Sequence, residues 1–158
     1  GLWRPKQKRP QAVHPLRERR PCRGELIQID GSPHAWFEGR SSRCTLIVFI
    51  DDATGELMSL AFWPQETTES YMSGLQGYLA EHGRPVSLYS DKHSIFRINT
   101  ETADGNTVTQ FGRAVEALDI DIIHANTPQA KGRVERVNRT LQDRLIKEMR
   151  LEGIDNIE

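Results

Sequence analysis

Three carboxylates are the side chains of this chain best suited to chemistry, and Glu135 is the most informative of them. It lies in the segment Pro-Gln-Ala-Lys-Gly-Arg-Val-Glu-Arg-Val-Asn, residues 128–138, after a glycine-containing basic loop and at the start of an amphipathic helical pattern. Asp30 and Asp91 each end an apolar run, Leu-Ile-Gln-Ile-Asp and Val-Ser-Leu-Tyr-Ser-Asp. Acids from two strand ends and one helix suit a pair of hard divalent cations, which take oxygen ligands and leave positions open for phosphate oxygens.

The same three acids also have an ordinary structural interpretation. Asp30 and Asp91 would end strands as turn residues, and Glu135 would be one solvated helix acid among several. Carboxylates at strand ends are common, so the residue types alone favour this simpler interpretation. Four further aspartates lack even the matching sequence context and are not predicted to be ligands: Asp51, Asp52, Asp104 and Asp119.

Four segments together resemble the catalytic core shared by retroviral integrases and the DDE transposases of bacterial insertion sequences, most closely those of the ISNCY type. They are Gln-Ile-Asp-Gly-Ser-Pro-His-Ala-Trp-Phe-Glu-Gly at 28–39, Phe-Ile-Asp-Asp-Ala-Thr-Gly at 49–55, Tyr-Ser-Asp-Lys-His-Ser at 89–94, and residues 128–138. They occur in family order within residues 24–150. Many relatives have Asn-Gly after the second acid, where this chain has Lys92 and His93, so contacts of that loop are not carried over.

The resemblance implies an α/β, ribonuclease H-like fold and an enzyme, a DDE-type polynucleotidyl transferase. Asp30, Asp91 and Glu135 would hold two Mg²⁺ or Mn²⁺ ions, with Asp30 shared between them. The implied partners are transposon-end and target DNA, and the protein would form a homo-oligomer. Two alternatives stay open: a structure-selective ribonuclease H-like nuclease, and a non-catalytic DNA-binding or assembly fragment. An intact triad does not by itself make this fragment active alone.

Basic and polar residues around the acids are predicted to contact DNA phosphates rather than to form only a solvated helix face. This predicted DNA-contacting set is Lys92, His93, Lys131, Arg133, Arg136, Asn138 and Arg139. Asn138 has a second interpretation, in which its amide steadies an acid of the site. For His34 and His124 an incidental role is the simpler prediction, and for Trp36 and Phe37 core packing is favoured over stacking on a base.

The elements needed to position the acids follow from the apolar patterns. Residues 25–30, 45–50 and 57–63 are predicted to be strands of an antiparallel meander, the second buried on both faces. Residues 66–82 and 107–118 are predicted to be helices, and residues 86–89 and 120–123 strands. In the last helix an apolar stripe faces the core: Val134, Val137, Leu141 and Leu145. The order predicts a mixed five-stranded sheet flanked by helices.

Charge is distributed unevenly along the 158 residues. Residues 1–23 have eight Lys/Arg, four prolines and one acid, a net charge of +7, whereas the remainder has a net charge of −8. We predict a basic, extended arm at 1–23 that stays outside the core, followed by a catalytic core domain at 24–158. In the family such a linker joins helix-turn-helix modules to the core, so the chain is expected to be a fragment. Two idle cysteines and the lack of a membrane-length apolar run favour a cytoplasmic, nucleoid-associated prokaryotic protein.

Overall fold

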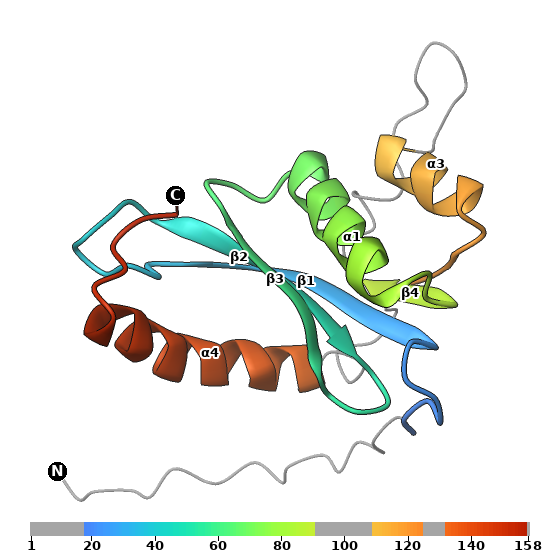
Figure 1. The fold of residues 1–158 in the computed structure, drawn as a ribbon, viewed down its shortest axis with the longest axis horizontal. Coiled ribbons are helices and arrows are strands. Elements are labelled where there is room, and N and C mark those ends of the chain that lie inside the picture. The colour runs from blue at the N-terminus through green and yellow to red at the C-terminus, as the bar shows by residue number, and fades with distance from the viewer. Residues whose placement is uncertain (1–17, 91–108, 125–131, 158) are drawn as a thin grey trace, which may run out of the picture.

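The computed structural model describes residues 18–90, 109–124 and 132–157, which form one mixed sheet with helices on both faces (Figure 1). The sheet has five strands in the order β3-β2-β1-β4-β5. The first three are antiparallel neighbours, whereas β4 pairs in parallel with β1 and with β5. The strands are β1 (Leu26–His34), β2 (Cys44–Asp51), β3 (Leu57–Trp63), β4 (Ser87–Ser90) and β5 (Asp121–His124). The predicted meander and the predicted five-stranded mixed sheet are therefore confirmed.

Helices α1 (Thr68–His82) and α3 (Gln110–Ala117) lie on one face of the sheet, and α4 (Gly132–Leu151) lies on the other (Figure 1). Two separate cores result, because alternate side chains of each strand point to opposite faces. Ile27, Ile29, Ile47 and Phe49 belong to the core under α1 and α3. The α4 core contains the intervening positions of β2, two aromatic residues and three residues of α4: Leu46, Val48, Ile50, Trp36, Phe37, Val134, Ile146 and Met149. The other residues of the predicted stripe, Val137, Leu141 and Leu145, are partly buried and pack against this core. Every residue of β2 is buried, as its continuous apolar run predicts.

Helix α1 begins two residues later than predicted, because Thr67 forms its N-cap. The Thr67 hydroxyl accepts a bond from the Ser70 backbone N–H at 3.2 Å, and the Ser70 hydroxyl accepts one from the Thr67 N–H at 3.1 Å. The helix ends at Gly83, whose φ of +78° favours glycine. Glu66, predicted to be helical, therefore lies in the loop before the helix.

Strand β1 is longer than predicted, and this extension places Asp30 inside the strand rather than at its end. The ladder between β1 and β2 continues from Ile27 to His34, although Gly31 and Pro33 suggest a break in sequence. The ladder between β1 and β4 ends earlier, at Gln28. Beyond that point β1 has a described neighbour on one side only, where a proline is tolerated. Asp30 thus lies where β4 separates from β1.

Candidate active site

Asp30 lies on the face of β1 that α4 covers, and a hydrogen bond joins it to that helix. The Asn138 side-chain amide donates to Asp30 Oδ2 at 2.8 Å. One turn further along α4, Gln142 donates to the Ser32 hydroxyl at 3.1 Å. Asp30 and Ser32 share a face of β1 because they are two residues apart, and Asn138 and Gln142 share a face of α4 because they are four apart. The two bonds therefore join the same face of the strand to the same face of the helix. They fix the rotation of α4 relative to β1.

Asn138 is 8% exposed, and its carbonyl oxygen Oδ1 is a further feature of the site. Its Oδ1 is buried and has no hydrogen-bond partner among the described residues. A buried carbonyl oxygen without a partner is unfavourable in free energy unless an ion, a water or a ligand satisfies it. Asp30 offers carboxylate oxygens and Asn138 a carbonyl oxygen, and both are hard donors of the kind that Mg²⁺ and Mn²⁺ accept. The residues present therefore fit the divalent ions that the sequence motifs imply.

Glu135 lies in the first turn of α4, three residues before Asn138 and therefore on a neighbouring part of the same helix surface. Its side chain is exposed and makes no hydrogen bond or ion pair with the described part of the chain. Arg139, one turn further along α4, does not pair with Glu135 in the described part of the chain. Arg136 and Arg139 are exposed on the same helix, so two of the predicted DNA-contacting side chains are accessible to solvent.

The other predicted site residues lie outside the described residues or are described only in part. Asp91, Lys92, His93 and Lys131 lie outside them, and of Arg133 only the helical backbone is described. Within residues 18–90, 109–124 and 132–157, no group of three or more His, Cys, Asp or Glu side chains converges as a metal site. The predicted convergence of all three acids therefore stays a prediction. The described contacts bring together Asp30 and the helix that contains Glu135.

Glu66 is a carboxylate that contacts Gly31, the residue after Asp30, and it is not among the site residues predicted from sequence. Its carboxyl carbon would lie 2.6 Å from a Cβ built on Gly31, so the group occupies the space of a side chain at that position. The buried Tyr71 hydroxyl donates to Glu66 Oε1 at 2.6 Å. Burial raises the pKa of Tyr71, and the bond to Glu66 and the charges of Glu66 and Asp30 raise it further, so the hydroxyl stays protonated. The available sequence signal was a glycine within a strand, which often marks a close approach.

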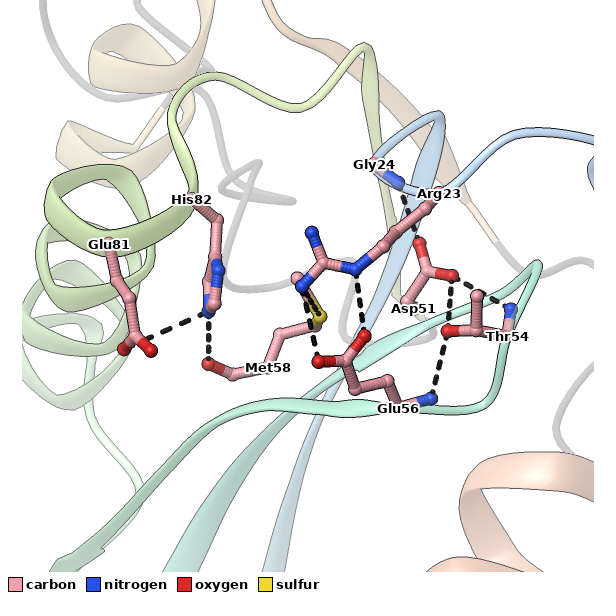
Figure 2. A network of polar contacts seen from close by, with 8 residues as sticks. All are labelled: Arg23, Gly24, Asp51, Thr54, Glu56, Met58, Glu81 and His82. Atoms are coloured by element: carbon pink, nitrogen blue, oxygen red, sulfur yellow. Dashed lines mark hydrogen bonds and ion pairs between the residues drawn. The ribbon is translucent and has the colours of Figure 1, made fainter.

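A second group of acids, at the start of β1, holds the end of the predicted arm (Figure 2). We call these contacts the clasp. Asp51, fully buried, accepts bonds from the Gly24 N–H, the Thr54 N–H and the Thr54 hydroxyl, each 2.8 Å long. Arg23 binds Glu56 through two nitrogens, at 2.7 and 3.1 Å. These contacts attach the chain before β1 to the turn between β2 and β3.

Asp52 extends the clasp toward the interior of the protein. It accepts the Arg20 N–H at 2.9 Å and the Gln28 side-chain amide at 2.7 Å. Burial alone would raise the pKa of Asp51, but the bonds from Gly24 and Thr54 and the charge of Arg23 outweigh it and lower that pKa. Of the predicted arm, residues 18–23 are described and contact the body, while the boundary at residue 23 stays a prediction.

The aromatic and sulfur-containing residues have structural roles. Trp36 and Phe37 are both 0% exposed, so the predicted core packing is confirmed. The Trp36 indole N–H donates to the Ser32 carbonyl at 2.8 Å, and its ring packs edge-on against His34 at 5.5 Å. Cys44 is buried and Cys22 is exposed, and both thiols are free.

Comparison with known proteins gives two sequence relatives and a group of structural neighbours. The chain is 57% identical over 155 residues to a Sinorhizobium fredii protein named as the transposase y4bF, and 42% identical over 152 residues to the transposase of insertion sequence IS1202 from Streptococcus pneumoniae. The matches cover 98% and 94% of this chain but 34% and 32% of those proteins, so it spans about a third of their length. No protein-family model matches the sequence.

The structural neighbours include chains from retroviral integrase structures. One belongs to a simian T-cell lymphotropic virus intasome, with a TM-score of 0.68, 23% identity, and coverage of 89% of this chain and 47% of that one. Another is the HTLV-2 integrase catalytic core domain in complex with magnesium, with a TM-score of 0.60, 18% identity, and coverage of 80% and 73%. The resemblance to DDE transposases and integrases is thereby confirmed, and the fold is ribonuclease H-like. No helix in the described part of the chain is long and apolar enough to cross a membrane.

Proposed function

We propose that this chain is the catalytic core of a DNA transposase, which nicks transposon ends and transfers the freed strands to target DNA. The observation that carries the proposal is the 2.8 Å bond from Asn138 to Asp30, because it joins the helix of Glu135 to the strand of the first acid. Relatives named as transposases, 57% and 42% identical, support the assignment. The oligomeric state and the cytoplasmic location remain predictions.

In this mechanism Asp30, Asp91 and Glu135 would hold two divalent ions through carboxylate oxygens, and Asn138 orients Asp30. When bound, the ions supply charge neutralisation at the attacked phosphate and lower the pKa of the attacking water. One structural neighbour, the HTLV-2 integrase catalytic core domain, is in complex with magnesium, which supports the choice of cation. Arg136 and Arg139, exposed beside Glu135, bind the phosphates that flank the reacting one. The protein contributes positioning and electrostatics, and no covalent protein–DNA intermediate is required.

The test is a nicking and strand-transfer assay with labelled transposon ends, run on the full-length protein and on this chain. Glu135→Gln keeps the side-chain shape and removes the charge needed to hold a metal, so both reactions should fall by about 1,000-fold or more. DNA affinity should stay equal or rise slightly, because a negative charge facing phosphate is lost.

Glu148→Gln is the matched control, because it makes the same change at an exposed position near the other end of α4 and should leave both reactions unchanged. If Glu135→Gln cuts DNA at the wild-type rate, the proposed mechanism is wrong. Cutting without strand transfer by the wild-type full-length protein would favour the nuclease alternative. Binding without either reaction would favour the non-catalytic alternative.

A further inference from the structure

The contact between Glu66 and Gly31 brings a further acid to the strand of Asp30. Glu66 approaches Gly31 so closely that a Cβ there would lie 2.6 Å from its carboxyl carbon and 2.8 Å from Oε1. Gly31 has no positive φ, so its backbone conformation does not require glycine. The lack of a side chain at Gly31 instead leaves room for the Glu66 carboxylate. A half-buried carboxylate thus occupies a position where an apolar side chain would complete the core.

The position of Glu66 relative to Asp30 follows from the sheet. Neighbouring residues of a strand project to opposite faces, so the two carboxylates lie on either side of β1. The ladder between β1 and β4 has already ended at Gln28, so β4 does not pair with β1 at Asp30 or Gly31. The charge of Asp30 also contributes to raising the pKa of Tyr71, the residue that binds Glu66, so both acids act on the same hydroxyl.

Tyr71 keeps Glu66 in this position. Its ring is 0% exposed and packs against Phe111 at 6.2 Å, so the hydroxyl is a rigid donor. The bond of 2.6 Å fixes one carboxylate oxygen, Oε1, while Oε2 lies 3.0 Å from the Cβ position of Gly31. The bond from the neutral Tyr71 hydroxyl therefore orients the Glu66 carboxylate.

We propose that Glu66 is an accessory carboxylate of the metal site, a positioning residue that strengthens divalent-cation binding at Asp30 through its charge. The inference rests on the proposed function, since it assumes that Asp30 binds a metal. A negative charge near a bound divalent ion lowers the free energy of the bound state, and a half-buried position reduces the solvent screening of that effect. Gly31 and Tyr71 hold the charge in place.

The experiment is a Mn²⁺ titration of this chain in which free Mn²⁺ is followed by electron paramagnetic resonance. Glu66→Gln keeps the volume and an oxygen that accepts from Tyr71, and it removes only the charge. It should raise the Kd for Mn²⁺ about tenfold. Glu69→Gln, an exposed change of the same kind in the first turn of α1, should leave the Kd within about twofold of wild type.

Three further variants complete the test. Glu66→Asp keeps the charge and should retain most of the affinity, whereas Tyr71→Phe keeps the charge but removes the bond and should weaken binding less than Glu66→Gln does. If the glutamine variant does not fold, Glu66→Ala removes the charge and also relieves the contact with Gly31. Asp30→Asn should abolish binding at the site.

The outcomes separate this inference from the proposed function. Wild-type affinity in the folded charge-free variants, together with lost binding in Asp30→Asn, would overturn the role of Glu66 alone. Unchanged binding in Asp30→Asn would overturn the proposed metal site as well.

Discussion

Carboxylates gather at two places along β1, and their partners differ. In the clasp, Asp51 is fully buried and receives two backbone N–H groups and a hydroxyl, while Glu56 is paired with Arg23. Further along the strand, Asp30 is half-buried and receives the neutral amide of Asn138. A bond from a neutral amide orients a carboxylate without cancelling its charge. Several donors around a buried carboxylate stabilise its charged form and thereby the folded state. The described contacts of the clasp therefore stabilise the fold, whereas the bond from Asn138 orients Asp30 as the proposed function requires.

The strongest test of this comparison is the substitution of Asp30. Asp30→Asn should reduce nicking and strand transfer by about 1,000-fold or more, because an amide cannot hold a divalent ion as a carboxylate does. The melting temperature of the metal-free protein should stay within about 2 °C of wild type, since the side-chain shape and one acceptor oxygen remain. Calorimetry without metal and the labelled-end assay with Mg²⁺ measure the two effects. A large loss of stability with activity retained would show that Asp30 stabilises the fold and does not act in the reaction.

The complementary change is in the clasp. Asp51→Ala leaves the N–H groups of Gly24 and Thr54 without their acceptor in a buried site, which should destabilise the fold by about 3 kcal/mol. For a domain of this size that lowers the melting temperature by roughly 6–12 °C. Asp143→Ala is the control, because Asp143 is exposed on α4 and pairs with Lys147 at the surface, so its loss should change the melting temperature little.

Truncation separates the clasp from the rest of the predicted arm. Deleting residues 1–17 removes none of the described clasp contacts and should leave the melting temperature unchanged. Deleting residues 1–23 removes Arg20 and Arg23, with their contacts to Asp52 and Glu56, and should lower it. Equal melting temperatures for the two truncations would contradict a stabilising clasp.

A smaller effect should appear in the dependence of stability on pH. The folded-state pKa of Asp51 lies below the ordinary value of 3.8, so its stabilising contribution is complete above that value and is lost as the pH falls through the folded pKa. The melting temperature of the wild type should therefore fall more steeply than that of Asp51→Asn between about pH 5 and about pH 2. Parallel curves would show that Asp51 titrates alike in both states.

The smallest expected effect concerns DNA binding at α4. Arg136→Ala or Arg139→Ala should lower the slope of log affinity against log salt by about one for each lost phosphate contact, with little change in stability. Lys147→Ala on the same helix is the control, because Asp143 pairs with Lys147 at 2.6 Å and offsets its charge. Salt-titrated binding curves measured on all three variants distinguish a DNA-contacting surface from a general loss of positive charge.

Local patterns in the sequence were sufficient for much of the fold. Strand β3 occupies the predicted residues, Leu57–Trp63, because turn residues bound it on both sides. The predicted end of β1 was wrong, since Gly31 and Pro33 are strand breakers locally and only the pairing with β2 extends the strand past them. The start of α1 depended on which residue became the N-cap, a choice made by side-chain bonds that composition does not reveal.

The candidate site was predictable only where a motif existed. Asp30, Glu135 and Asn138 are part of recognisable segments, and the bond between Asp30 and Asn138 matches one of the two interpretations given to Asn138. Glu66 and the clasp were missed because the contacts that reveal them, Gly31 with Glu66 and Gly24 with Asp51, join distant parts of the sequence. The bond of Gly24 to Asp51 joins residues 27 apart, and nothing local distinguishes that aspartate from a turn residue.

The bond between Asp30 and Asn138 also bears on how the protein is made. It joins residues 108 apart, from the first strand and the last helix. A ribosome therefore completes the antiparallel hairpins of β1, β2 and β3 long before α4 emerges, and the growing chain carries Asp30 without the helix that orients it. If the proposed function holds, a nascent or prematurely terminated chain that lacks α4 has Asp30 but neither Glu135 nor Asn138. Such a chain should not cut nearby nucleic acid. On that proposed function, the order of synthesis delays a complete site until α4 has been made.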